Sequence, residues 1–167
     1  MERRPARYNR FVAPRPERAR LERQAQRVDA RVLSTLNRIA LPALRISLGV
    51  VFIWFGALKL LDVSPVSGLV ARTVYWFDPD IVVPALGVFE IAVGSMLVLN
   101  RLLRVALALF AAQMAGTFLV FAVLPDVAFS DGNPLRLTVE GEFVVKNLVL
   151  LTAGMVVGSR LPTIGTT

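Results

Sequence analysis

The sequence predicts an all-α membrane protein: a four-transmembrane-helix bundle with both termini cytoplasmic and an N-terminal basic amphipathic helix. Hydrophobic residues make up 55% of the chain and gather in four long blocks instead of forming amphipathic stripes. Basic residues concentrate where the cytoplasmic ends would lie. Three of the four blocks contain one charged residue each, Lys59, Glu90 and Lys146. A charge at bilayer depth costs about 2.5 to 3.5 kcal/mol, so these residues mark the place to look for a functional site.

Residues 1–38 are predicted to form a cytoplasmic arginine-rich tail. From about Pro16 to Arg38 the tail is predicted to be helical, because apolar residues recur at spacings of three and four: Leu21, Ala25, Val28, Val32, Leu36 and Ile39. We expect this helix to lie on anionic lipid head groups, since each basic residue near such a surface contributes about 1 kcal/mol. A partner subunit and a solvated tail are the alternatives, and nucleic acid is a minor one.

Residues 39–161 are predicted to hold the transmembrane domain, followed by a short tail at 162–167. The four spans are expected at about 44–61, 81–99, 105–124 and 143–161. A helix needs about 20 apolar residues to cross the hydrocarbon, which the first three blocks satisfy directly. The fourth is shorter, and its end requires Arg160 to extend its guanidinium to the interface.

The distribution of charge predicts the orientation. The first 45 residues are net +8, and the remaining 122 are net −1. The connection at 100–104 is net +2, whereas the loops at 62–80 and 125–142 are net −2 and −3. The positive-inside rule therefore places both termini in the cytoplasm. Seventeen arginines against two lysines suggest a GC-rich bacterial genome, hence a bacterial cytoplasmic (inner) membrane.

Cysteine and histidine are both absent from the sequence. This excludes a disulfide, a thiolate nucleophile, histidine-ligated haem, a zinc site with nitrogen and sulfur ligands, and a Ser-His-Asp triad. No metal site is expected, and no cofactor is expected to be bound covalently. If the protein takes part in redox chemistry, the electrons reside on a bound quinone, a soluble substrate or a cofactor in a partner.

Helical spacing gives the lone charges a direction. Lys59 shares a face with two glycines of the first span, and Glu90 shares a face with two glycines of the second. Small residues line the faces where membrane helices meet, so both charges should point inward. In the third span Ala108, Ala112 and Gly116 form a similar ridge. The predicted packing glycines are Gly49, Gly56, Gly87, Gly94, Gly116, Gly154 and Gly158.

Together these positions predict a polar pocket that opens outward. Its members are Lys59 and Lys146 at the mouth, Glu90 and Gln113 deeper, with Asn147 and Trp54 nearby. Three interpretations remain open: a structural ion pair between a lysine and Glu90, a site for an anion or a quinone head group, and a proton or solute pathway.

The two predicted outer loops have some structure of their own. A short helix is expected over Val66–Phe77, with Ser64 as its N-cap and Pro65 in its first turn. Residues 135–139 alternate enough to form a short strand or an extended lid, which would cover the mouth of the pocket.

Three stretches resemble the DoxX-like membrane proteins: Arg45 to Lys59 (RISLGVVFIWFGALK), Gly87 to Glu90 with Gly94, and Gly141 to Leu151 (GEFVVKNLVLL). The resemblance covers about residues 40 to 160, and within the family it is nearest to the YkgB branch, which includes the reactive-chlorine-resistance protein RclC. It implies a four-helix inner-membrane protein linked to sulfur, thiol or oxidant chemistry, since relatives include the small subunit of a thiosulfate:quinone oxidoreductase.

The resemblance therefore implies an accessory component of quinone-linked redox or oxidative-stress defence. A redox partner subunit or a homo-oligomer would accompany it. The alternative is a small transporter or a scaffold subunit of a larger complex, in which the charged cluster is purely structural. Whether the chain is itself an enzyme is left open.

Overall fold

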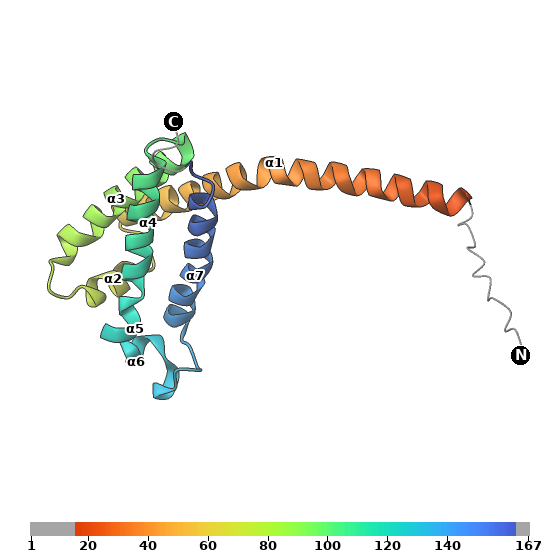
Figure 1. Ribbon diagram of the computed structural model, residues 1–167. Helices are drawn as coiled ribbons and strands as arrows, with labels where there is room; N and C mark the ends of the chain where they lie inside the picture. The colour runs from red at the N-terminus through yellow and green to blue at the C-terminus, as the bar shows by residue number, and fades with distance from the viewer. Residues whose placement is uncertain (1–15, 163–167) are drawn as a thin grey trace, which may run out of the picture. The chain divides into compact units, whose positions relative to one another are not determined.

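The computed structural model describes residues 16–162, and predictions for residues outside this range are not addressed by it (Figure 1). Every regular element in the described range is helical: α1 (Pro16–Leu60), α2 (Ser67–Thr73), α3 (Pro79–Leu99), α4 (Leu103–Thr117), α5 (Leu119–Val123), α6 (Pro125–Ala128), the 3-10 turn η1 (Ser130–Gly132) and α7 (Val139–Gly158). Between residues 16 and 162 no strand forms, and Phe129 and Leu137 share one isolated bridge. The predicted all-α class is confirmed.

Among the described residues, four helical segments are long and apolar enough to cross a membrane: Gln24–Leu60, Pro79–Leu99, Leu103–Val123 and Val139–Gly158. The protein is therefore a multi-pass membrane protein built on four spanning helices, as predicted. The last span begins earlier than the sequence suggested, because the Thr138 hydroxyl accepts a hydrogen bond from the Gly141 amide and starts the helix there. With 20 residues from Val139, α7 reaches bilayer length by Gly158 and ends before the predicted limit at Leu161.

The chain divides into two compact units, Met1–Ile39 and Ala40–Thr167, and each is described by itself. In the first unit the described residues belong to α1, and the apolar side chains of Val28, Val32, Leu36 and Ile39 are at least half exposed. The sequence predicted one helix ending near Arg38 and another starting at Leu44. Instead α1 includes both ranges, because no helix-terminating glycine separates them and Pro42 is accommodated inside the helix.

The second unit is held together by an apolar core between α1, α3, α4 and α7. Its buried members are Leu48, Phe52, Val93, Leu97, Ala106, Phe110, Met114 and Val157. Phe52 of α1 and Phe110 of α4 have ring centroids 4.7 Å apart. A smaller cluster of Val120, Ala128 and Val144 joins α5, α6 and α7. Helix α7 contributes to both clusters, through Val157 in the larger and Val144 in the smaller.

Helices α1 and α3 meet through two pairs of glycines. A Cβ added to Gly49 would lie 2.7 Å from the Gly94 carbonyl oxygen, and one added to Gly56 would lie 2.5 Å from the Gly87 carbonyl oxygen. The two glycines on each helix are seven residues apart, and the helices are antiparallel. The two backbones therefore stay in contact over two turns. Any side chain at these positions would force the helices apart.

The other predicted packing glycines behave differently from one another. Gly154 of α7 receives the ring of Phe110, whose nearest atom would be 2.8 Å from an added Cβ. An added Cβ at Gly158 would make only an ordinary contact with Leu107, and one at Gly116 would meet nothing within 4 Å. The prediction that Gly116 packs against another helix is therefore wrong.

The predicted ridge of Ala108, Ala112 and Gly116 on α4 faces outward and is exposed. The helix turns its opposite face to the core, where it buries Ala106, Phe110 and Met114. The absence of a side chain at Gly154 leaves a notch in α7 that accepts the large ring of Phe110. Helix α7 therefore packs against the face of α4 with bulky residues and not against the face with small residues.

At the other end of the bundle, two arginines donate to backbone carbonyl groups. The Arg45 guanidinium donates to the carbonyl oxygens of Leu97 (2.5 Å) and Val98 (3.2 Å) in the last turn of α3. The Leu97 carbonyl also accepts from the Asn100 amide at the C-cap, and a cation at this helix end complements the helix dipole. Arg104 similarly donates to the Pro162 carbonyl. Arg45 therefore caps the end of α3, and Arg104 links α4 to the segment after α7, while both carry the positive charge of this side.

The substitution Gly56→Ala should lower the stability of the second unit. The added methyl group would meet the Gly87 carbonyl oxygen at 2.5 Å and the Ile91 amide nitrogen at 3.0 Å, and neither backbone atom can move without shifting a helix. We expect a loss of about 1 to 3 kcal/mol in unfolding free energy, the usual effect of overpacking, measured by circular dichroism in mixed micelles.

The matched control is Gly68→Ala in α2, where an added Cβ meets nothing within 4 Å. This variant should be as stable as the wild type or slightly more so, because alanine favours the helix. Equal losses in the two variants would contradict the close α1–α3 contact.

Candidate functional site

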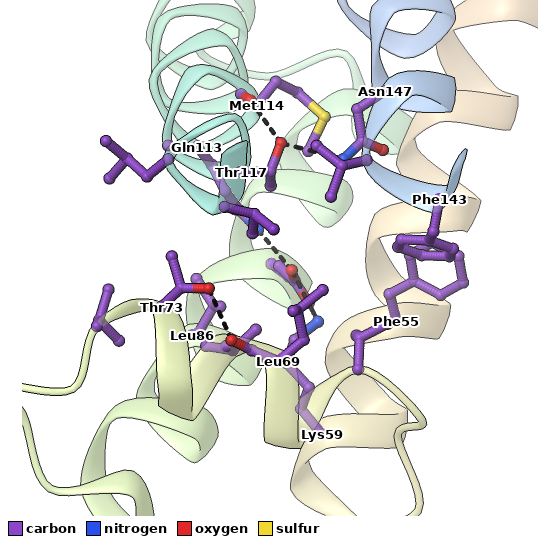
Figure 2. Close-up of a pocket in the computed structure, with 18 of the residues that line it drawn as sticks. Phe55, Lys59, Leu69, Thr73, Leu86, Gln113, Met114, Thr117, Phe143 and Asn147 are labelled. Carbon is purple, nitrogen blue, oxygen red and sulfur yellow. Dashed lines mark hydrogen bonds and ion pairs between the residues drawn. The ribbon is translucent and has the colours of Figure 1, made fainter. Parts of the chain in front are cut away.

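A cavity of about 400 Å³ lies inside the second unit, lined by α1, α2, α3, α4, α5 and α7 (Figure 2). Most of the lining is aliphatic or aromatic. The polar members of the lining are Lys59, Thr73, Glu90, Gln113, Thr117 and Asn147. The cavity is therefore an apolar chamber with a few polar groups at fixed points of its wall, which is typical of a small-molecule site.

The strongest polar contact in this wall is a buried ion pair. The Lys59 Nζ donates to both carboxylate oxygens of Glu90, at 2.9 and 2.7 Å, and the two residues are only 4% and 6% exposed. Gln113 Nε2 donates to Glu90 Oε1 at 2.5 Å. The carboxylate thus receives three hydrogen bonds from two other helices, which compensates for its removal from water.

The glycine contact explains why Lys59 reaches Glu90. Because Gly56 touches Gly87, the Cβ of Lys59 lies 3.1 Å from where a Cβ of Gly87 would be, less than one turn before Glu90. Helix α3 begins at Pro79, so about two of its turns extend past this level, whereas α1 ends at Leu60. The prediction that Lys59 lies at the mouth of the pocket, further out than Glu90, is therefore wrong. The lysine is enclosed by α2 and by the turns of α3 that extend past the end of α1.

A second polar contact joins α7 to α4. Asn147 Nδ2 donates to the Thr117 hydroxyl at 3.0 Å, and that hydroxyl donates to the Met114 carbonyl at 2.6 Å. Asn147 is only 7% exposed. The bond lies at the last residue of α4, beside the cavity, and connects the two helices there (Figure 2).

Lys146 and Trp54 do not belong to the cavity. The Lys146 side chain is 73% exposed and lies 3.5 Å from Glu142, the i,i+4 partner on its own helix. One residue corresponds to about 100° of rotation on a helix, so Asn147 turns inward and Lys146 turns away. Trp54 is 64% exposed for the same reason, because it is two residues after the buried Phe52. The prediction of two lysines at the pocket mouth is wrong.

The cavity has an aromatic wall that sequence reasoning missed. Phe55 and Phe143 lie side by side with centroids 6.1 Å apart, and Phe52 and Phe89 line the cavity as well. The positions carried a usable signal, since Phe55 precedes Lys59 by four residues and Phe143 precedes Asn147 by four, so each ring shares a helical face with a predicted polar residue.

The cover of the cavity also differs from the prediction. Helix α2 supplies Leu69, Val70 and Thr73 to the lining, whereas residues 135–139 do not line it. The helix begins at Ser67, with Val66 at its N-cap and no side-chain cap, so Ser64 does not cap it. The lid therefore comes from the first loop. In the second loop, Leu137 forms a backbone bridge with Phe129 instead of covering the cavity.

The chemistry of the cavity distinguishes among classes of ligand. The Lys59 ammonium is occupied by Glu90, and Lys146 lies outside, so no unpaired cation faces the chamber from the residues described. An anion would lose its hydration without a matching charge, which disfavours it. In residues 16–162 no group of three or more potential ligands could hold a metal ion. The site suits an uncharged, largely apolar ring with a few hydrogen-bonding atoms.

Comparison with known proteins gives one match. The DoxX family model matches residues 40–123, which include the first three spans of the second unit and Lys59, Glu90 and Gln113. No curated protein and no solved structure matches the chain.

Removal of Lys59 should be far more damaging than removal of Lys146. Lys59→Met leaves the Glu90 carboxylate buried without its cation, and breaking a buried pair in this way costs about 3 to 5 kcal/mol. Lys146→Met removes an exposed lysine and should change unfolding free energy by no more than about 0.5 kcal/mol. The measurement is unfolding in mixed micelles.

The double variant Lys59→Met with Glu90→Gln should regain much of the loss, because no buried charge is left unpaired. Equal effects of Lys59→Met and Lys146→Met would contradict the ion pair.

Proposed function

Since the chain belongs to the DoxX family, we propose that it is a quinone-binding accessory component of a membrane redox system that serves sulfur or thiol chemistry or oxidant defence. The observation that carries this proposal is the apolar, aromatic-lined cavity with the Lys59–Glu90–Gln113 cluster in its wall. The cavity lies among membrane-spanning helices, where a hydrophobic electron carrier is available from the lipid.

The size and lining of the cavity suit a quinone head group. Its volume of about 400 Å³ is within the usual range for small-molecule sites. Phe55 and Phe143 offer ring faces or edges for a flat aromatic ligand. An amide NH₂ has two donors and an ammonium three, so Gln113, Asn147 and Lys59 each retain a proton for a quinone carbonyl after their protein contacts.

The same wall offers groups for both redox states of the ring. Reduction of a quinone to a quinol adds two electrons and two protons, which convert both carbonyls to hydroxyls. Glu90 and Lys59 are the titratable side chains of the lining and are positioned to exchange protons with the ring. Gln113 Oε1 is buried without a donor among the described residues, so it is available to a quinol hydroxyl.

The electrons must come from elsewhere. The chain has no cysteine or histidine with which to hold an iron–sulfur cluster or haem in the usual way. A partner subunit or a soluble reductant would therefore supply them, and for this reason we propose an accessory component and leave independent catalysis aside. The family resemblance of Gly141–Leu151 adds the YkgB branch to this proposal.

We also propose that the chain lies in the bacterial cytoplasmic membrane with both termini inside. Arg45, Arg101, Arg104 and Arg160 gather at the end of the bundle where α3 gives way to α4 and α7 ends. The loops at the other end are net acidic. This asymmetry agrees with the positive-inside rule.

A scaffold function is the second candidate. Lys59 and Glu90 already satisfy each other, and they come from α1 and α3, the two helices that meet at the glycine pairs. A purely structural ion pair would have the same arrangement. On this alternative the protein would position other subunits, and its cavity would hold lipid.

Quinone binding decides between the two candidates. Wild-type protein in nanodiscs, titrated with decylubiquinone, should show a saturable rise in melting temperature, because a ligand of the folded state stabilises it. Gln113→Leu removes one hydrogen bond to Glu90 and one to the ring, and should weaken binding about tenfold.

Lys146→Met is the control and should bind as the wild type does. Absence of saturable binding to the wild type would overturn the proposal. Normal binding by Gln113→Leu, Lys59→Met and Glu90→Gln, with only their stability lowered, would favour the scaffold.

A further inference from the structure

One face of α4 is exposed along its whole length. Val105, Ala108, Ala112 and Ala115 lie on it at spacings of three and four, and all four are exposed. The face belongs to the apolar segment Leu103–Val123, which is long enough to span a membrane. An exposed apolar face in such a segment contacts lipid acyl chains.

This outward face continues into the wall of the cavity. Gly116 and Leu119 follow on the same side of the helix, and both line the cavity. Among the lining residues these two are the exposed ones, since the rest are buried or half-buried. The cavity therefore has an edge on the lipid-facing side of α4 and α5.

The local backbone leaves space at this edge. Helix α4 ends at Thr117 and α5 starts at Leu119, so the regular helix is interrupted between the two exposed lining residues. A Cβ added to Gly116 would meet no atom within 4 Å. The missing side chain thus leaves an opening beside Leu119, which we call the lateral portal (Gly116 and Leu119).

The lid of the cavity is apolar, and it lies beside α5, since Leu69 of α2 packs against the cluster that contains Val120. Helix α2 places Leu69 and Val70 in the lining, and Val74 at its C-cap follows them there. The hydroxyl of its buried Thr73 donates to the Leu69 carbonyl. No charged residue of α2 lines the cavity, although Arg72 belongs to this helix. A ligand arriving from water would therefore find no polar entrance through the lid.

We infer that ligands enter and leave this cavity sideways from the bilayer through the lateral portal, and that the ligand is an amphiphile whose apolar tail stays in the portal and the lipid. This inference rests on the proposed quinone function and adds the route and the tail. The ring of the ligand would occupy the chamber beside Gln113, while its apolar tail emerges between Gly116 and Leu119.

Single-cysteine labelling tests the lateral portal, because the chain has no cysteine of its own. Gly116→Cys places a thiol in the portal. Ala112→Cys places one on the same exposed face one turn away and outside the cavity lining, and serves as the matched control. Both variants are reconstituted in nanodiscs and labelled with a lipophilic maleimide, with and without saturating quinone.

Decylubiquinone should slow labelling of Gly116→Cys about tenfold and leave Ala112→Cys unchanged, since a tail in the portal covers the first thiol alone. Duroquinone, which is fully substituted and has no tail, should protect neither thiol. Equal protection of Gly116→Cys by both quinones would overturn the role of the tail. Oxidative cross-linking of Gly116→Cys between two chains would also overturn the inference, by showing that a second copy covers this face.

A second variant narrows the opening without adding a thiol. Leu119→Trp should slow association of decylubiquinone about tenfold, with little effect on duroquinone. If the wild type binds decylubiquinone but Leu119→Trp and Gly116→Cys report no change, the portal inference fails while quinone binding stands. If the wild type binds no quinone in the melting assay, the proposed function itself fails.

Discussion

The close approach of α1 and α3 at their glycine pairs is the constraint from which the rest of the site follows. Lipid provides no hydrophobic drive for helices to associate, so contact between backbones must supply the packing. Gly56 against Gly87 fixes the register of the two helices, and that register brings the Lys59 ammonium to the Glu90 carboxylate. With a larger residue at either glycine, both charges would lose their partners at a depth where neither is easily tolerated.

The cavity is a second consequence of the same register. Because α3 extends past the end of α1, a step is left beside Lys59, and α2 folds over it. Between α4 and α7, the ring of Phe110 fits the notch at Gly154 and holds the two helices together. Near Thr117 the helix is interrupted and Gly116 contributes no side chain, so the space between these walls stays empty.

The sequence predicted the spanning helices well because length and apolar composition are local properties. It could not predict which face of α4 points inward. Both faces are apolar, one small and one bulky, and only the partner helix, through the notch at Gly154, selects between them. The same limit applies to Lys146 and Asn147, two adjacent polar residues of which one must face outward.

The lid was unpredictable for a different reason. Helix α2 has no side-chain cap at its N-terminus, and its position depends on how far α3 extends past α1, which is a property of two helices together. Lys59 was likewise expected near the surface because its depth was counted from the end of its own helix. Burial of a residue near a helix end depends on what neighbouring elements add beyond that end.

The neutrality of the Lys59–Glu90 pair links the geometry to the proposed chemistry. A lone charge in this wall would favour a charged ligand, which could not leave through lipid. A closed pair leaves the chamber without net charge, so an uncharged ring can enter at little electrostatic cost. Two electrons accompanied by two protons convert a quinone to a quinol that is again uncharged, so both redox forms remain soluble in the membrane. The opening toward lipid lets such an uncharged carrier reach the cavity, and the neutral ion pair lets it bind there in both redox forms.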